Sequence, residues 1–128
     1  MKSLARVRAV IMTVCVALLL SACSKSPEST VESFYNAVAN GEITEARSYL
    51  SDQILCMMGE KKITAGLTEQ YEKMQACEGI KEIKVEMKGD GELRSGSATI
   101  TFNGDCPQNV EKTKLIEEDG VWKITAAK

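Results

Sequence analysis

The sequence predicts an α+β domain in which N-terminal helices cover one face of a curved four-stranded antiparallel sheet. Apolar residues recur at helical spacing between Ser26 and Gly79, and after Gly79 the period changes to two. The four alternating segments that follow are separated by short turns, as in an antiparallel meander. Helices in the first half and strands in the second half are the mark of the α+β class.

The first helix is expected to begin at Ser26-Pro27-Glu28. The Ser hydroxyl can cap the helix, the missing N–H of Pro costs nothing at this position, and the acid faces the positive end of the helix dipole. Asn40-Gly41 should end the helix, because Gly tolerates the left-handed conformation. The apolar stripe between these ends comprises Val31, Phe34, Tyr35 and Val38.

Two further helices and an ambiguous segment are expected before the sheet. Thr44 is the expected cap of the second helix, which ends near Ser51-Asp52 and has Ile43, Ala46, Tyr49 and Leu50 on one side. Residues 54–58 are apolar without a clear period, and we interpret them as a helical turn. Thr64 is the expected cap of the third helix, which Gly79 closes. Its inner face comprises Leu67, Tyr71, Met74 and Cys77 or Glu78.

Four strands are predicted from the alternation of apolar and polar residues. Ile83, Val85 and Met87 define the first strand, which ends at a turn over residues 89–91. The others are expected over residues 98–102, 110–116 and 121–124, joined by turns at 103–105 and 118–120.

The first 22 residues have the pattern of a lipoprotein signal peptide. Three basic residues precede an apolar run over residues 10–20, which is shorter than the roughly 20 residues that a membrane span needs. Leu20-Ser21-Ala22-Cys23 then matches a lipobox, which predicts lipidation at Cys23; an ordinary secretory signal is the alternative. Residues 23–25 would form a short tether, and residues 26–128 one domain.

Composition limits the function classes. The 106 residues after the signal carry 13 basic and 18 acidic side chains, a net charge of −5, which argues against nucleic acid as a charge-driven partner. The length suits a single domain that buries about 65% of its unfolded surface. The chain contains no His, so Ser-His-Asp and Cys-His catalysis and His-ligated zinc are excluded.

The order of elements and two motifs resemble small bacterial lipoproteins with a nuclear-transport-factor-2-like, cystatin-like domain of uncharacterised function. The motifs are Ser-Pro-Glu-x-x-Val-x-x-Phe-Tyr at 26–35 and Glu-Asp-Gly-Val-Trp-Lys-Ile at 118–124. The resemblance implies a strongly bent sheet that wraps the first helix as a cone, often with a pocket inside. It does not imply one activity, because this superfamily includes isomerases, dehydratases and binding modules.

Three cysteines remain beyond the signal and the lipid acceptor. In the predicted meander Cys77 and Cys106 lie just outside the paired ends of the first hairpin. A helix of about 14 residues would separate Cys56 from Cys77 by roughly 20 Å, far beyond the ~7 Å Cα limit of a disulfide. The topology therefore favours a Cys77–Cys106 disulfide, with the other pairings as alternatives. Cys56 would then be a buried small apolar residue or, alternatively, a free reactive thiol.

The sequence contains candidates for a pocket but no catalytic constellation. Five aromatic residues could line a cone or, alternatively, form its core: Phe34, Tyr35, Tyr49, Tyr71 and Trp122. Asp52 or Glu32 with a Tyr partner would be the acid–base candidates. Three scattered Cys without His do not have the pattern of a metal site, so neither a metal nor a cofactor is expected.

We therefore expect a lipid-anchored periplasmic binding or interaction module without enzymatic activity. Its partners would be the membrane, through the N-terminal lipid, and an envelope protein or a small apolar ligand. Ser24, in place of Asp, after the lipidated Cys implies the periplasmic face of the outer membrane. A small cone-shaped isomerase or hydratase, or a purely structural envelope lipoprotein, are the alternatives.

Overall fold

The computed structural model describes residues 25–126, which form four helices followed by four strands. The elements are α2 (Pro27–Ala39), α3 (Ile43–Ser48), α4 (Asp52–Met58), α5 (Glu60–Ala76), β1 (Ile80–Lys88), β2 (Leu93–Phe102), β3 (Asn109–Glu118) and β4 (Val121–Thr125). This order confirms the α+β prediction. The predicted signal peptide and its lipidation site, Cys23, lie outside the described residues.

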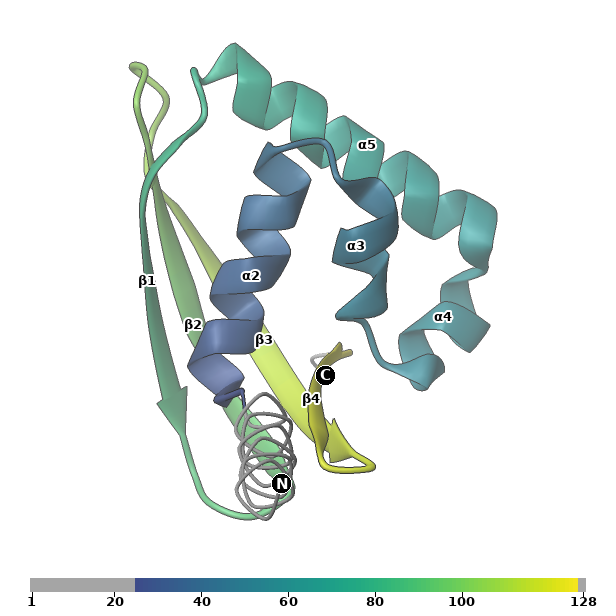
Figure 1. Ribbon diagram of the computed structural model, residues 1–128. Coiled ribbons are helices and arrows are strands. Elements are labelled where there is room, and N and C mark those ends of the chain that lie inside the picture. Colours follow the sequence, from purple (N-terminus) through teal and green to yellow (C-terminus); the bar gives the residue numbers. More distant parts are fainter. Residues whose placement is uncertain (1–24, 127–128) are drawn as a thin grey trace, which may run out of the picture.

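The sheet is an antiparallel meander in the order β1-β2-β3-β4. In Figure 1, α2 lies across one face of this sheet, while α3, α4 and α5 extend beyond it. A side chain at Gly96 would overlap the carbonyl oxygen of Glu86 on the neighbouring strand. Such a Gly marks a close approach of two strands in a bent sheet. β2 is also longer than predicted, because residues 93–97 extend the pairing with β1 and β3.

The local signals for the first helix are confirmed, and two others are wrong. The Ser26 hydroxyl accepts a hydrogen bond from the Ser29 N–H, and Gly41 has the expected positive φ of 75°. Thr44 and Thr64 are not caps, because α3 already begins at Ile43 and α5 at Glu60.

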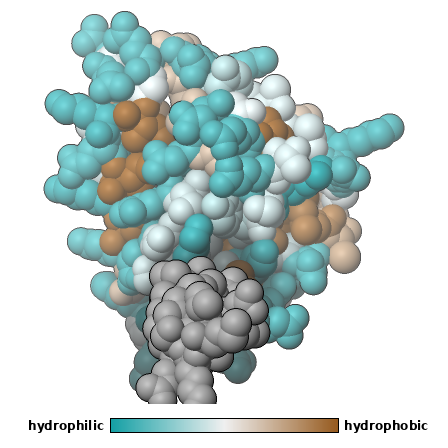
Figure 2. Space-filling model, in the orientation of Figure 1, coloured by the Kyte–Doolittle hydropathy of each residue, from teal (hydrophilic) through white to brown (hydrophobic). Residues whose placement is uncertain are grey.

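The apolar residues 54–58 belong to a complete short helix, α4. Ser51 caps this helix by accepting a hydrogen bond from the Ile54 N–H. α4 contains no buried residue. Most of the surface seen in Figure 2 is hydrophilic, and one of its apolar areas lies over α4. There Met57 and Met58 are 68% and 51% exposed.

Helix α2 joins the two parts of the hydrophobic core. On one side it packs with the other helices, in a cluster of Phe34, Ala37, Val38, Ala46, Leu50, Ile63, Leu67 and Met74. On the other side it packs on the sheet, in a cluster of Val31, Ala98, Leu115 and Trp122. Burying an aliphatic side chain contributes about 1.5–3 kcal/mol, so α2 is the main stabilising helix.

The last strand fastens the sheet to the helical half. Leu50 and Ile124 form a parallel bridge, and the Ser51 N–H donates to the Ile124 carbonyl at 2.8 Å. The buried Ser51 hydroxyl also donates to Thr125 Oγ1 at 3.0 Å. Within residues 25–126, no helix has both the length and the apolar character needed to cross a membrane.

Candidate functional site

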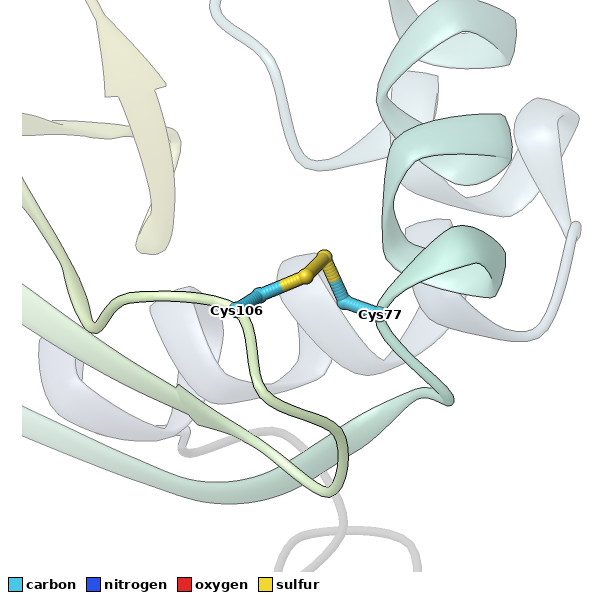
Figure 3. The surroundings of a disulfide bond; sticks show 2 residues. All are labelled: Cys77 and Cys106. Carbon is cyan, nitrogen blue, oxygen red and sulfur yellow. A yellow bond between two sulfur atoms is a disulfide. The ribbon is translucent and has the colours of Figure 1, made fainter.

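A disulfide connects Cys77, at the end of α5, with Cys106, in the connection between β2 and β3 (Figure 3). The two Cα atoms are 5.5 Å apart, within the usual range for a disulfide. The predicted pairing is therefore confirmed. Among the described residues Cys56 has no disulfide partner, and it is exposed on α4, so its predicted burial is wrong. The reason is that α4 packs against the core of the other helices through Ile54 and Leu55, whereas the Cys56 side chain lies on the outer side of α4.

Hydrogen bonds reinforce the disulfide at one end of the β2–β3 connection. The Gly104 N–H donates to the Cys77 carbonyl at 2.9 Å, and the Asn103 N–H donates to the Gly79 carbonyl at 3.0 Å. The side-chain amide of Asn103 donates to the Glu78 carbonyl, also at 3.0 Å. The residues just after Cys106 have fewer such restraints, so the disulfide is what holds this part of the connection against α5.

A cavity of about 620 Å³ opens beside the disulfide, between α2, the last turns of α5 and the start of β3. This volume lies within the usual range of small-molecule sites. Its lining combines apolar and polar residues: Tyr35, Gln70, Lys73, Met74, Ala76, Cys77, Phe102, Cys106, Pro107, Gln108, Asn109 and Glu111.

Tyr35 is the polar group of the cavity that α2 contributes. Burial, and secondarily the negative charge of Glu111, raise the pKa of its hydroxyl to about 12. The hydroxyl therefore stays protonated at physiological pH and can donate a hydrogen bond. Its ring packs edge-on against Phe34, with 5.1 Å between the ring centroids, which fixes its orientation.

Glu111 is the acidic group of the cavity, and sequence reasoning did not select it. The Asn109 side-chain amide donates to Glu111 Oε1 at 3.0 Å. A signal for this position existed in the sequence. Leu115, Thr113 and Glu111 follow a period of two, and in the sheet Glu111 pairs with the buried Ala98, so all of them share the inner face.

The five predicted aromatic residues do not come together around the cavity. Only Tyr35 lines it. Phe34 and Trp122 are core residues, exposed by 7% and 9%, and Tyr71 packs on the helical core. Tyr49 borders a separate, shallower hollow of about 270 Å³, and its hydroxyl donates to Glu45. Periodicity places an aromatic residue on the inner side of an element, but it does not distinguish a packed core from a cavity.

The predicted acid–base candidates are not in the cavity. Glu32 lies exposed on α2, and Asp52 lies exposed in the first turn of α4. Neither contributes to the cavity lining. Within the described part of the chain, no three His, Cys, Asp or Glu residues gather in a way that could hold a metal ion.

A second large hollow, of about 630 Å³, lies on the outer face of the sheet. Lys88, Lys112 and Lys114 surround it together with Ser95 and Ser97. Apart from the buried Thr113, it is lined by exposed or half-buried residues of the strands, and it has the character of a solvated sheet surface. We therefore regard the cavity beside the disulfide as the candidate site.

Comparisons with known proteins give structural neighbours alone, since neither protein-family models nor curated proteins match the chain. A Campylobacter jejuni protein named "Putative NTF2-like transpeptidase" superposes with a TM-score of 0.68 at 21% identity, covering 80% of this chain and 100% of that one. A SEC-C motif containing protein from Rhodopseudomonas palustris superposes with a TM-score of 0.56 at 13% identity, covering 88% of this chain and 86% of that one. The chain therefore has the nuclear-transport-factor-2-like fold that its sequence predicts.

Proposed function

We propose that this protein is a lipid-anchored binding module at the periplasmic face of the bacterial outer membrane, and that its cavity takes a small ligand. Two features support the location. The sequence at residues 20–23 has the lipobox pattern, and the domain contains a disulfide, a bond typical of exported proteins.

The position of the cavity suits a protein held close to a membrane. Helix α2 starts at Pro27, only four residues after the proposed lipidation site, and its 13 residues extend for about 20 Å. Figure 1 shows the start of α2 at the end of the domain where β1 finishes, and the β2–β3 connection at the opposite end. A lipid at Cys23 would thus leave the cavity beside this connection open toward the periplasm.

The cavity itself is the observation that carries the proposal. It combines apolar walls with a hydroxyl donor and a carboxylate acceptor, which is the usual composition of a small-molecule site. A protein partner that inserts a side chain into the cavity would use the same surface. A purely structural lipoprotein would have no use for it.

Native mass spectrometry of the mature protein, extracted from membranes in mild detergent, tests the proposal. We expect a bound mass that is lost on denaturation, and a protein mass that includes the lipid. An Ala76→Trp variant should lose the bound mass, because Ala76 is an exposed cavity residue whose enlargement obstructs the opening. Ala65→Trp is the matched control, since Ala65 is exposed on the same helix away from the cavity. A bare protein mass in all variants would contradict a binding function.

Catalysis is the second candidate, because the Campylobacter jejuni neighbour is named a transpeptidase. Tyr35 and Glu111 are residue types that can transfer protons. Against this, the cavity lining includes no Ser or Thr, and both of its Cys are in the disulfide, so the usual nucleophiles of acyl transfer are missing there. Glu111 is also exposed, whereas a catalytic acid of the isomerase type would lie within an apolar environment. A turnover of peptide substrates that Tyr35→Phe abolishes would favour the enzyme.

A further inference from the structure

The Tyr35 hydroxyl is a donor that no acceptor in the described part of the chain uses. Within residues 25–126 it takes part in no hydrogen bond, although its ring is partly buried against both clusters of the hydrophobic core. No fully buried side-chain oxygen or nitrogen in this part of the chain lacks a partner. The unpartnered hydroxyl must therefore be accessible, and the cavity that Tyr35 lines is where a ligand would meet it.

Glu111, which lines the same cavity from β3, offers the opposite function. Its Oε1 accepts from the Asn109 amide, and no hydrogen bond within the described residues uses its Oε2. A carboxylate oxygen can accept more than one hydrogen bond, so this group remains available to a ligand N–H or O–H. The cavity thus presents one donor and one strong acceptor to the same occupant.

The charges around the cavity disfavour an anionic ligand at Tyr35. The charge of Glu111 acts on the Tyr35 hydroxyl, so it would also act on an anion bound there. Lys73 is the one cation among the lining residues, and its ammonium pairs with Glu69 at 3.0 Å. The remaining polar lining groups are the neutral amides of Gln70, Gln108 and Asn109.

We infer that the ligand presents an uncharged amide, whose carbonyl accepts from Tyr35 and whose N–H donates to Glu111. An amide carries its acceptor and its donor on separate atoms and has no charge, so it can meet both groups at once, whereas a hydroxyl carries both on one oxygen. An apolar substituent of the ligand contacts Met74 and Phe102. This inference rests on the proposed function and identifies the chemical class of the occupant.

The test measures the binding of three probes to the mature lipidated protein in neutral detergent by NMR titration. The probes are 3-phenylpropanamide, 3-phenylpropanoate with its free carboxylate, and n-propylbenzene, which has neither group. We expect the amide to bind at least about fivefold more tightly than the carboxylate, the order of effect of one unfavourable charge interaction at partial solvent exposure. Ala76→Trp should weaken the binding of all three probes, and Ala65→Trp should not.

Two conservative variants assign the hydrogen bonds. Tyr35→Phe should weaken amide binding by about two- to tenfold, the range of one net hydrogen bond, and leave n-propylbenzene unaffected. Tyr49→Phe removes the same hydroxyl outside the cavity and should change nothing. Glu111→Gln should tighten binding of the carboxylate probe, whereas Glu72→Gln, on the exposed side of α5, should not.

The outcomes separate this inference from the proposed function. Binding of n-propylbenzene that Ala76→Trp weakens, without preference for the amide or sensitivity to Tyr35→Phe, overturns the inference and leaves the proposed function intact. If none of the probes binds and native mass spectrometry shows no bound mass, both are wrong. Preference for the carboxylate probe also overturns the inference.

Discussion

The cysteines of the described domain lie in two regions of the molecule, one of which contains a disulfide and the other an exposed thiol. At the end of α5, Cys77 is tied to Cys106 and contributes to the wall of a cavity. On α4, Cys56 is unpaired, and its neighbours Met57 and Met58 are more than half exposed. The first region is covalently fixed where a ligand would bind, and the second is a short helix that buries none of its side chains.

The difference shows that position in the topology, and not residue type, decides what a cysteine contributes. The antiparallel hairpin β1–β2 returns the chain to the end of α5, so Cys106 meets Cys77. Strand β4 meets the start of α4, where Thr125 bonds to Ser51 and Gln53, but this contact consists of hydrogen bonds and does not involve Cys56. The comparison predicts large effects at the disulfide and small effects on the surface of α4.

The largest effect is expected from the double variant Cys77→Ser, Cys106→Ser. The disulfide spans a sequence separation of 29 residues, and its loss should lower the free energy of unfolding by about 3–4 kcal/mol on the chain-entropy model. Denaturant unfolding measures this change. Under reducing conditions the wild-type protein should approach the variant. An unchanged unfolding midpoint would show that the hydrogen bonds around Gly104 suffice to hold the connection.

The attachment of α4 is expected to be the next most sensitive feature. Ser51→Ala removes the N-cap of α4 and the buried hydrogen bond to Thr125, so the free energy of unfolding should fall by about 1–2 kcal/mol. Ser48→Ala serves as a control, because the exposed Ser48 hydroxyl bonds only to the local Glu45 carbonyl. Equal losses in the two variants would contradict the role assigned to Ser51.

Alkaline pH should lower the free energy of unfolding through Tyr35, the tyrosine that lines the cavity. The pKa of Tyr35 is raised from 10.0 to about 12 in the folded protein, so the unfolded chain releases this proton first. Its stabilising contribution is complete well below pH 10 and is lost as the pH rises toward 12; at pH 11 the loss is about 1.4 kcal/mol. Thermal unfolding between pH 9 and 11.5 measures it. Tyr35→Phe should flatten this part of the profile, whereas Tyr49→Phe should not.

The smallest effects are expected on the outer side of α4. Cys56→Ser and Met57→Ser change exposed side chains and should alter the free energy of unfolding by no more than about 0.5 kcal/mol. The same denaturant experiment measures both. A loss larger than that of Ser51→Ala would mean that the surface of α4 packs against something in solution, and would reverse the comparison.

Local signals in the sequence predict the ends of an element correctly where one residue determines the backbone conformation. Ser26 with Pro27 defined the start of α2, Gly41 its end, and the change of period after Gly79 the start of the sheet. The disulfide followed from topology once the hairpin was assigned. The predicted caps at Thr44 and Thr64 are wrong because a Thr side chain can also lie inside a helix. Whether it caps the helix or lies within it depends on how the neighbouring helices pack.

The site depended on information that a single sequence carries weakly. Tyr35 was among the pocket candidates, but nothing local distinguished it from Phe34, which is one residue away and packed in the core. Glu111 resembled an ordinary charged residue of an exposed strand. Its role depends on the register with β2 and on the position of α5, and both are tertiary features.

The contact between Ser51 and Thr125 also has a consequence for the order of folding. It joins residues 74 positions apart, whereas the hydrogen bond that caps α4, from the Ile54 N–H to the Ser51 hydroxyl, is local. Contacts this distant in sequence form late, because closing a long loop costs entropy before it yields any interaction. We therefore expect the attachment of α4 to the sheet to form only after β4 has joined the sheet, and to be lost early when the native protein fluctuates.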